Sequence, residues 1–231
     1  MRRARLWGSI VLFSVVGCVN ATPDPVPVVA EASTGGQPAP PAGQSGDASQ
    51  CFQDSYDAEV LAKYDVALAA LDRLPPNYRT GYVATLRRGW LLSQLGRYKE
   101  AVEAYRAAAT LEPKSVEAQI GEIVGLAALG RFADVEAVAR DLLKRDPANH
   151  VANIRLAFAL YSQGHFAEAE TSYRTVLALY PSDVDAMAGL GWCRFKRGLR
   201  AEAAALFADT LAIAPKSKPA LEGARVTAGG K

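Results

Sequence analysis

The sequence has few of the side chains that most often perform chemistry. Its 231 residues contain two histidines and three cysteines. No pair of them has the short spacing typical of a metal site, so we expect no metal. Serine, cysteine and lysine occur without a recognisable nucleophile motif around them. The composition therefore argues against an enzyme, and we expect no catalytic residues and no cofactor.

An excess of charge is also missing. The formal net charge is +2, and Arg2, Arg3 and Arg5 account for it, because the rest of the chain carries −1. A basic face with interleaved aromatic residues, typical of proteins that bind nucleic acids, is absent, so we expect no nucleic-acid partner. An enzyme or regulator acting on peptidoglycan or polysaccharide remains the alternative of another class. It would need paired carboxylates facing a cleft, whereas acids such as Glu100 and Glu168 are scattered along helix faces.

Long apolar runs are scarce, and the one that stands out lies at the start. Met1 to Arg5 holds three arginines, and the apolar run from Leu6 to Val16 follows. This run is too short to span a bilayer but has the length of a signal-peptide core. Val15-Val16-Gly17-Cys18 then resembles the bacterial lipoprotein signal, in which the cysteine is acylated as the signal peptide is removed. We expect residues 1–17 to be a signal peptide and Cys18 to be lipidated; an ordinary secreted protein with a coincidental cysteine is the alternative.

The resemblance to lipoproteins implies a membrane anchor, for example with palmitate among its acyl chains. Each buried methylene contributes about 0.8 kcal/mol. Under the sorting rule of enterobacterial lipoproteins, Val19 rather than aspartate after Cys18 favours the outer membrane, facing the periplasm. The next residues are mostly Pro, Ala, Gly, Ser, Thr and Gln, which cannot bury enough surface to offset their ordering entropy. We expect residues 18–53 to form a lipidated, disordered tether.

Glycine and proline, by contrast, are present in regular series. Three sets of residues each recur at a step of 34: Gly96, Gly130, Gly164, Gly198; Pro113, Pro147, Pro181, Pro215; and Ser115, Asn149, Asp183, Ser217. Glycine ends a helix because it adopts the left-handed conformation easily, and proline cannot continue one. Ser, Asn and Asp accept hydrogen bonds at the first turn of a helix. Each repeat therefore predicts a cap, helix A, a glycine turn, helix B and a proline turn.

The apolar residues of the second helix support this interpretation. At helical spacing, one face of helix B carries in successive repeats Tyr98, Ala101, Tyr105, Ala108; Phe132, Val135, Ala139, Leu142; Phe166, Ala169, Tyr173, Val176; and Arg200, Ala203, Phe207, Thr210. Over residues 82–217 the pattern resembles the tetratricopeptide repeat, which has the same period. The resemblance implies an all-α fold, a right-handed superhelical solenoid of four helical hairpins. Departures from the family pattern are Thr85, Gln119, Asn153 and Met187 early in helix A, and Arg200 at an aromatic position.

Both ends of the repeat region are expected to differ from its middle, because terminal repeats have a wet outer face. Residues 54–81 predict a degenerate first repeat, either a hairpin or one longer helix, since Pro75 and Pro76 come early and no glycine stands at the turn. Residues 218–231 predict a C-terminal capping helix, started by Ser217, and a frayed tail.

A second stripe of helix A is the candidate binding site. In the tetratricopeptide family, the second, fifth, ninth and twelfth residues of helix A line the concave face that binds partner segments. Here these positions are largely apolar, and we name as the predicted groove Leu86, Trp90, Ile120, Val124, Ile154, Phe158, Tyr161, Trp192 and Phe195. Exposed apolar area and tryptophan are typical of binding sites, so we expect an apolar or helical partner segment. Packing of Trp90 and Trp192 into the core is the alternative.

The remaining reactive residues are expected to be structural. Cys193 is predicted to be a buried thiol, whereas Cys51 is left open between pairing with another molecule and no role. His150 and His165 are expected to be solvated at turns. Gly121 and Gly125 form a GxxxG pattern, which we interpret as helix packing.

The architecture favours a monomeric, non-enzymatic adaptor held to the bacterial envelope by its N-terminal lipid. It resembles the small tetratricopeptide lipoproteins called pilotins, which help the secretin rings of type IV pilus or secretion systems to assemble. A scaffold for envelope biogenesis or division that associates with a peptidoglycan or β-barrel assembly machine remains an alternative, as does a self-associating repeat protein. The resemblance implies the architecture, and a fold alone does not specify the partner.

Overall fold

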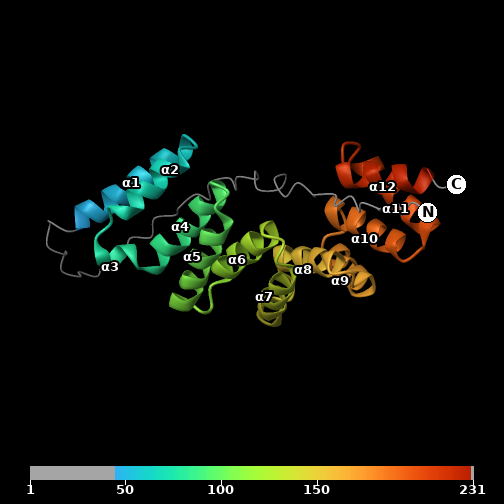
Figure 1. Ribbon diagram of the computed structural model, residues 1–231, viewed down its shortest axis with the longest axis horizontal. Helices are drawn as coiled ribbons and strands as arrows, with labels where there is room; N and C mark the ends of the chain where they lie inside the picture. Colours follow the sequence, from blue (N-terminus) through green and yellow to red (C-terminus); the bar gives the residue numbers. More distant parts are fainter. Residues whose placement is uncertain (1–44, 230–231) are drawn as a thin grey trace, which may run out of the picture. The chain divides into compact units, whose positions relative to one another are not determined.

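The computed structural model describes residues 45–229 of the chain (Figure 1). Over this range the chain forms twelve helices and no strand. Their bounds are α1 (Ser45–Val60), α2 (Tyr64–Asp72), α3 (Pro76–Arg79), α4 (Tyr82–Gln94), α5 (Tyr98–Leu111), α6 (Val116–Ala128), α7 (Phe132–Arg145), α8 (His150–Ser162), α9 (Phe166–Leu179), α10 (Val184–Lys196), α11 (Arg200–Ile213) and α12 (Lys218–Ala228). The predicted signal peptide, Cys18 and the tether up to residue 44 lie outside the described residues.

The predicted hairpins are confirmed. Helices α4, α6, α8 and α10 are the four A helices, and α5, α7, α9 and α11 are their B partners. Each A helix has 13 residues and each B helix 14. Each helix contacts the next in the chain, and each A helix also contacts the A helix of the following repeat. The all-helical solenoid expected from the period is therefore the fold of this region.

The turn and cap series explain where the helices end. The four turn glycines have φ between +70° and +85°, the left-handed region that glycine enters without a Cβ penalty. Ser115, Asn149 and Asp183 each accept a hydrogen bond from the backbone N–H three residues later. Ser217 is the N-cap residue of α12, as expected, but its side chain makes no capping hydrogen bond.

The first hairpin continues the same 34-residue series toward the N-terminus. The sequence reasoning did not extend the series this far. Ala62 lies one repeat length before Gly96 and takes the left-handed conformation with φ +54°, although it is not glycine. Helix α2 then begins at Tyr64, one repeat length before the start of α5 at Tyr98. Of the two alternatives for residues 54–81, the chain adopts the hairpin, formed by α1 and α2. Pro75 and Pro76 shorten α2 to nine residues.

The boundary of the tether differs from the prediction. Helix α1 begins at Ser45, whereas residues up to 53 were expected to be disordered. The reason is a stripe of small residues at helical spacing, Ala48, Cys51, Ser55 and Ala58, all of which are buried beside α2. Small residues barely raise local hydropathy, so composition alone hides this face.

The N-terminal end of the stack is closed by polar side chains. The third residue of helix A is alanine in every later repeat, and Ala84, Ala118, Ala152, Ala186 and Ala220 are at most 1% exposed. The equivalent residue of α1 is Gln50, which is exposed and donates a hydrogen bond to Asp54 (2.7 Å). Gln53 and Asp57, on the same side of α1, bond to each other at 2.8 Å. This polar face provides the wet outer surface expected of a terminal repeat.

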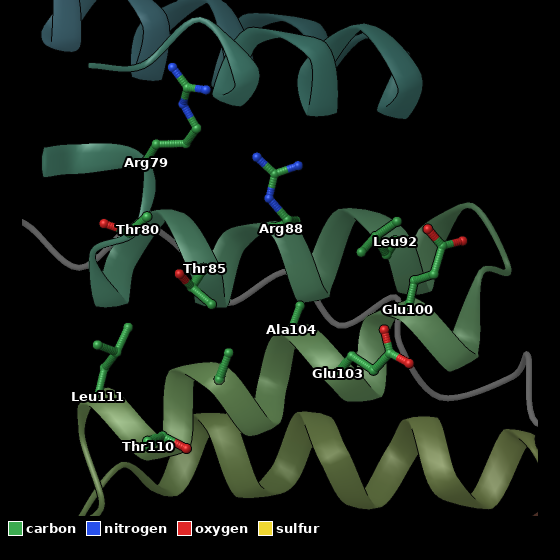
Figure 2. Close-up of a pocket in the computed structure, with 11 residues that line it drawn as sticks. Arg79, Thr80, Thr85, Arg88, Leu92, Glu100, Glu103, Ala104, Thr110 and Leu111 are labelled. Atoms are coloured by element: carbon green, nitrogen blue, oxygen red, sulfur yellow. The ribbon is translucent and has the colours of Figure 1, made fainter. Parts of the chain in front are cut away.

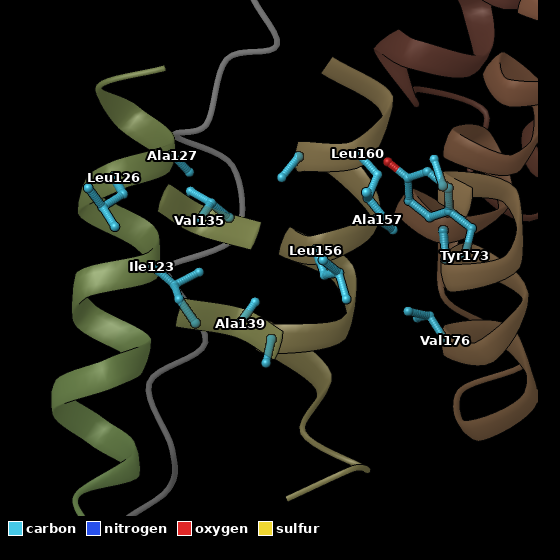
Figure 3. Close-up of a cluster of buried hydrophobic side chains, with 14 of the residues drawn as sticks. Ile123, Leu126, Ala127, Val135, Ala139, Leu156, Ala157, Leu160, Tyr173 and Val176 are labelled. Atoms are coloured by element: carbon cyan, nitrogen blue, oxygen red, sulfur yellow. The ribbon is translucent and has the colours of Figure 1, made fainter. Parts of the chain in front are cut away.

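The core is continuous through the middle repeats. Figure 3 shows its central part, where Ile123 and Leu126 of α6, Val135 of α7, and Leu156 of α8 are packed together. Smaller clusters lie at the N-terminal hairpin and around Phe207 of α11. In the part of the chain that is described, no helix is long and apolar enough to cross a membrane.

Candidate functional site

The nine residues of the predicted groove follow the A helices as expected from their positions. They come from α4, α6, α8 and α10, and every one of them is half-buried. Neighbouring A helices contact each other, so residues at the same helix position succeed one another along the stack. The nine residues therefore form an ordered stripe along the A helices, and none of their side chains is freely exposed.

Most of the nine side chains also serve the core. Leu86 and Trp90 pack against the N-terminal cluster, and the edge of Trp90 meets Tyr64 with ring centroids 5.8 Å apart. Ile120, Ile154 and Tyr161 pack against the central cluster. These five therefore have a structural role whatever else they bind.

The C-terminal end of the stripe is tied to the last helix. The Trp192 indole N–H donates a hydrogen bond to the Pro219 carbonyl of α12 (3.1 Å). The ring of Trp192 also packs on Phe195 and Phe207, at centroid distances of 5.8 Å and 5.4 Å. Helix α12 is in turn held by Arg200, whose guanidinium donates to the carbonyls of Thr227 and Val226 (2.9 and 2.6 Å). Arg200, which stands where the family usually has an aromatic residue, therefore holds the capping helix α12 in place.

Val124 and Phe158 differ from the other seven residues of the predicted groove in their relation to the core. Both lie outside the three core clusters of residues 45–229. They occupy the ninth position of two adjacent A helices, α6 and α8, which contact each other. Phe158 makes an edge-to-face contact with Phe132 at 5.6 Å. The centre of the stripe is therefore half-buried and belongs to none of the three clusters.

Sequence reasoning missed the N-terminal extension of the groove. One repeat length before Leu86 and Trp90 stand Phe52 and Tyr56 of α1. Tyr56 is 48% exposed, and Val83, at the second position of α4, is 56% exposed. The signal that could have found this extension is the 34-residue step itself. It was applied only from Tyr82 onward, because residues 18–53 have the composition of a tether.

A buried arginine fixes this end of the stripe. The Arg87 guanidinium lies 3.6 Å from the ring centroid of Tyr56 and 2.7 Å from the Glu59 carboxylate. Its Nε donates to the Ser55 hydroxyl (2.9 Å), which itself donates to the Ala67 carbonyl (2.9 Å). Arg87 thereby joins α4 to α1 and α2, and it holds the Tyr56 ring in place by a cation–π contact.

The reactive side chains near the stripe are poor candidates for chemistry. Burial raises the pKa of Tyr161 to about 12 and that of the Cys193 thiol to about 12. Both groups are therefore protonated at neutral pH, and a protonated thiol is a weak nucleophile. Cys193 is fully buried, as predicted. Cys51 is also buried, which does not favour pairing with another molecule.

His165 lies in the turn before α9, as expected, whereas His150 is the first residue of α8. His165 is exposed. His150 is half-buried rather than fully solvated, and its Nε2 is 2.5 Å from the Asp183 carboxylate. Among the described residues, no cluster of three His, Cys, Asp or Glu side chains could hold a metal ion.

A separate cleft of about 720 Å³ is lined by residues of α3, α4 and α5 (Figure 2). Its lining includes Arg79 of α3, Arg88 of α4, and Glu100 and Glu103 of α5. The two arginines are already engaged, since Arg79 donates to the Leu74 carbonyl (3.0 and 2.9 Å) and Arg88 to the Asp72 carboxylate (2.7 Å). Because its arginines are bound within the protein, we do not assign the cleft as a ligand site.

Three structures similar to this chain share its fold at low sequence identity. MamA (residues 41 to the end) from Desulfovibrio magneticus RS-1 superposes with a TM-score of 0.70 at 16% identity, covering 76% of this chain and 99% of that one. A tetratricopeptide repeat protein from Parabacteroides merdae gives 0.71 at 17% identity, covering 79% and 73%. YrrB, described as having an unusual peptide-binding site, gives 0.67 at 16% identity, covering 78% and 94%. No curated protein matches the chain.

Family models identify the repeats directly. Three tetratricopeptide repeat models match residues 84–115, 126–172 and 154–218, which together make up more than half of the chain. The matched ranges fall on the helical hairpins from α4 to α11. The 34-residue period, the hairpins and these matches show that the chain belongs to the tetratricopeptide repeat family.

Proposed function

We propose that this tetratricopeptide protein is a lipid-anchored adaptor of the bacterial envelope, which binds an apolar or helical segment of a protein partner. Tetratricopeptide repeats form protein-interaction scaffolds, and the coarse function follows from the family. The anchor at Cys18 and the place in the envelope, facing the periplasm from the outer membrane, are parts of the proposal that rest on the sequence of residues 1–19.

The single observation that carries the binding role is the stripe along the A helices. Its fifth and ninth positions are apolar or aromatic from Phe52 and Tyr56 to Trp192 over five consecutive A helices. The central residues Val124 and Phe158 are half-buried and lie outside the core clusters, so part of their apolar surface is open to a partner. An amphipathic helix laid along such a stripe buries its apolar face against them.

The finer proposal concerns the partner. A secretin subunit is the partner to test first, because small tetratricopeptide lipoproteins resembling this chain in layout act as pilotins. Only the combination of predicted anchor and repeat domain supports this choice. Other envelope machines and self-association are therefore included as outcomes of the same experiment.

Affinity capture from solubilised envelope tests the binding role. The variant Val124→Ser/Phe158→Ser alters the centre of the stripe, and Leu179→Ser/Ile213→Ser is the matched control. Leu179 and Ile213 are 44% and 58% exposed and lie at the ends of the B helices α9 and α11. We expect one prominent partner on the wild type and the control and its loss from the stripe variant, with circular dichroism verifying that all three are helical. Retention of the partner on the folded stripe variant would overturn the proposal.

Mass spectrometry tests the anchor separately. We expect the mature chain to begin at Cys18 and to carry acyl chains that a Cys18→Ser variant lacks. An unmodified chain or cleavage at another residue would contradict the anchor without affecting the binding role.

A further inference from the structure

The turn between α1 and α2 exposes three aliphatic side chains that we call the N-terminal tip. Val60 is 85% exposed, Leu61 64% and Val66 51%. The backbone of the turn is ordered, since the Ala62 N–H donates to the Glu59 carbonyl (2.7 Å) and the Lys63 N–H to the Ala58 carbonyl (2.9 Å). These side chains are therefore held outward by a fixed turn.

The same turn is more polar in every later repeat. The residue equivalent to Val66 is Glu100, Asp134, Glu168 or Glu202, an acid each time. The residue equivalent to Val60 is Gln94, Ala128, Ser162 or Lys196. A turn with the same backbone hydrogen bonds thus folds with other residues at the positions of Val60 and Val66, so folding does not explain these two aliphatic side chains. The position of Leu61 is leucine again at Leu95 and Leu129.

The charges around the tip nearly cancel. Lys63 and Asp65 are both exposed and carry opposite charges. Glu59 is compensated by Arg87 at 2.7 Å. The tip is therefore an apolar surface of low net charge, which suits a hydrocarbon environment rather than a charged protein surface.

We propose that the N-terminal tip inserts its aliphatic side chains into a lipid bilayer surface. This inference rests on the proposed anchor, which brings the membrane close. Between Cys18 and Ser45 lie 26 residues, and a flexible chain of that length spans roughly 28 Å root-mean-square. Helix α1 has 16 residues, about 24 Å at 1.5 Å per residue, so the tip lies within reach of the bilayer that holds the anchor.

A second copy of the chain fits the N-terminal tip less well than a bilayer does. Stable protein interfaces bury roughly 800 Å² on each partner, far more than three small side chains provide. The neighbouring outer face of α1 is polar, with Gln50, Gln53 and Asp57, so it does not extend the apolar surface. A bilayer needs no such extension, because the anchor already supplies the attachment.

Quenching of tryptophan by brominated lipid tests the proposal. The full chain is attached at position 18 to vesicles of dibrominated phosphatidylcholine, by its own acyl chains where mass spectrometry finds them and through a maleimide-headgroup lipid where it does not. Leu61→Trp reports on the tip, and Ile213→Trp, at an exposed site of α11, is the matched control. The native tryptophans are subtracted using the wild type.

We expect the added fluorescence of Leu61→Trp to fall at least about twofold relative to vesicles of unbrominated lipid. We expect no change for Ile213→Trp. Adding Val60→Ser and Val66→Glu, which installs residues of the later turns, should abolish the quenching of Leu61→Trp. Because the tip is nearly neutral, raising the salt concentration should leave the quenching unchanged. Equal signals at both sites, or loss of quenching in high salt, would overturn the proposal even when the anchor itself is confirmed.

Discussion

The ring of Tyr105 fills the space beside Gly121: a Cβ built on that glycine would lie 2.3 Å from the Tyr105 Cε1 atom. Gly89 lies on the other side, where a Cβ would come within 2.9 Å of the same ring. The aromatic residue of α5 is therefore held between glycines of α4 and α6. This contact confirms that Gly121 serves helix packing.

The arrangement recurs with compensating changes along the stack. Tyr173 and Phe207 face Gly189 and Gly223, each with a Cβ distance below 2.5 Å. In the remaining repeat, the B helix has the small Ala139 and the following A helix has Arg155 at the glycine position. A large side chain on a B helix thus goes with glycine on the next A helix, and a small side chain goes with a larger one.

We expect Gly121→Ala to destabilise the chain by at least about 2 kcal/mol, because overpacking forces the Tyr105 ring to move. In a Tyr105→Ala background the same substitution should cost clearly less. Urea unfolding followed by circular dichroism measures all four members of the cycle. Equal costs in the two backgrounds would show that the ring is not what excludes the methyl group.

The turn of the first hairpin predicts a stabilising substitution. Ala62 adopts φ +54° where the other turns have glycine, and a left-handed non-glycine residue costs about 1 kcal/mol. Ala62→Gly should therefore raise the free energy of unfolding by about 0.5 to 1 kcal/mol. Gly130→Ala is the reverse substitution at an equivalent turn. A Cβ at position 130 meets open space, so we attribute the expected loss of about 1 kcal/mol in the free energy of unfolding to backbone strain alone. A loss of stability in Ala62→Gly would contradict the strained turn.

Two serines at equivalent positions, Ser115 and Ser217, are predicted to differ in how much they stabilise the fold. The Ser115 hydroxyl accepts from the Ala118 N–H (3.0 Å) and contacts the Tyr82 hydroxyl (2.7 Å), whereas Ser217 makes no capping bond. Ser115→Ala should cost about 1 kcal/mol of unfolding free energy, as typical N-caps do. Ser217→Ala should change it by less than about 0.5 kcal/mol. Thermal unfolding of the two variants side by side measures the difference, and equal losses would refute the assignment of the caps.

Glu170 joins α9 to the C-terminal end of α10 and predicts a dependence of stability on pH. Its carboxylate contacts Arg174 (3.0 Å), Arg194 (2.8 Å) and Arg197, while its own side chain is 6% exposed. Burial by itself raises the pKa of Glu170, but Arg197 and Arg194 outweigh it and hold the pKa below its ordinary value. The stabilisation is therefore complete above the unfolded-state pKa, roughly 4.3, and is lost as pH falls through the lower native pKa.

Glu170→Gln should lower the free energy of unfolding at pH 7 by about 1 to 3 kcal/mol, since the largely buried Arg194 then loses a carboxylate partner. Below pH 4 the difference from the wild type should shrink. Glu168→Gln is the control, because its side chain is 62% exposed and should matter by less than about 0.5 kcal/mol. Urea titrations at several pH values check both, and a difference that grows at low pH would contradict the lowered pKa.

Sequence reasoning succeeded where one residue type has one physical role. The turn glycines, the proline stops and three of the four caps predicted every boundary from α4 to α11 closely. It left the first hairpin open between a hairpin and one longer helix, because Ala62 stands where the later turns have glycine. It also extended the tether to residue 53, because the buried face of α1 consists of small residues such as Ala48 and Cys51. Extending the 34-residue step one repeat toward the N-terminus would have predicted both the turn at Ala62 and the helix α1.

The predicted groove shows another limit of the sequence. Position in the repeat placed all nine residues on one stripe, but it could not say how neighbouring helices share them. Trp192 is engaged by Pro219 of α12, a contact that depends on how the last helix packs. Tyr56 is more exposed than any of the nine, yet it precedes the region that the period had marked.

The most direct test of the central claim is photo-crosslinking in the living cell, with benzoylphenylalanine placed at Val124 in the stripe or at Leu179 outside it. Our account predicts an adduct between this chain and another protein from position 124, and none from position 179. An adduct from position 179 with none from position 124 would show that the partner binds elsewhere and that the stripe is part of the packing alone.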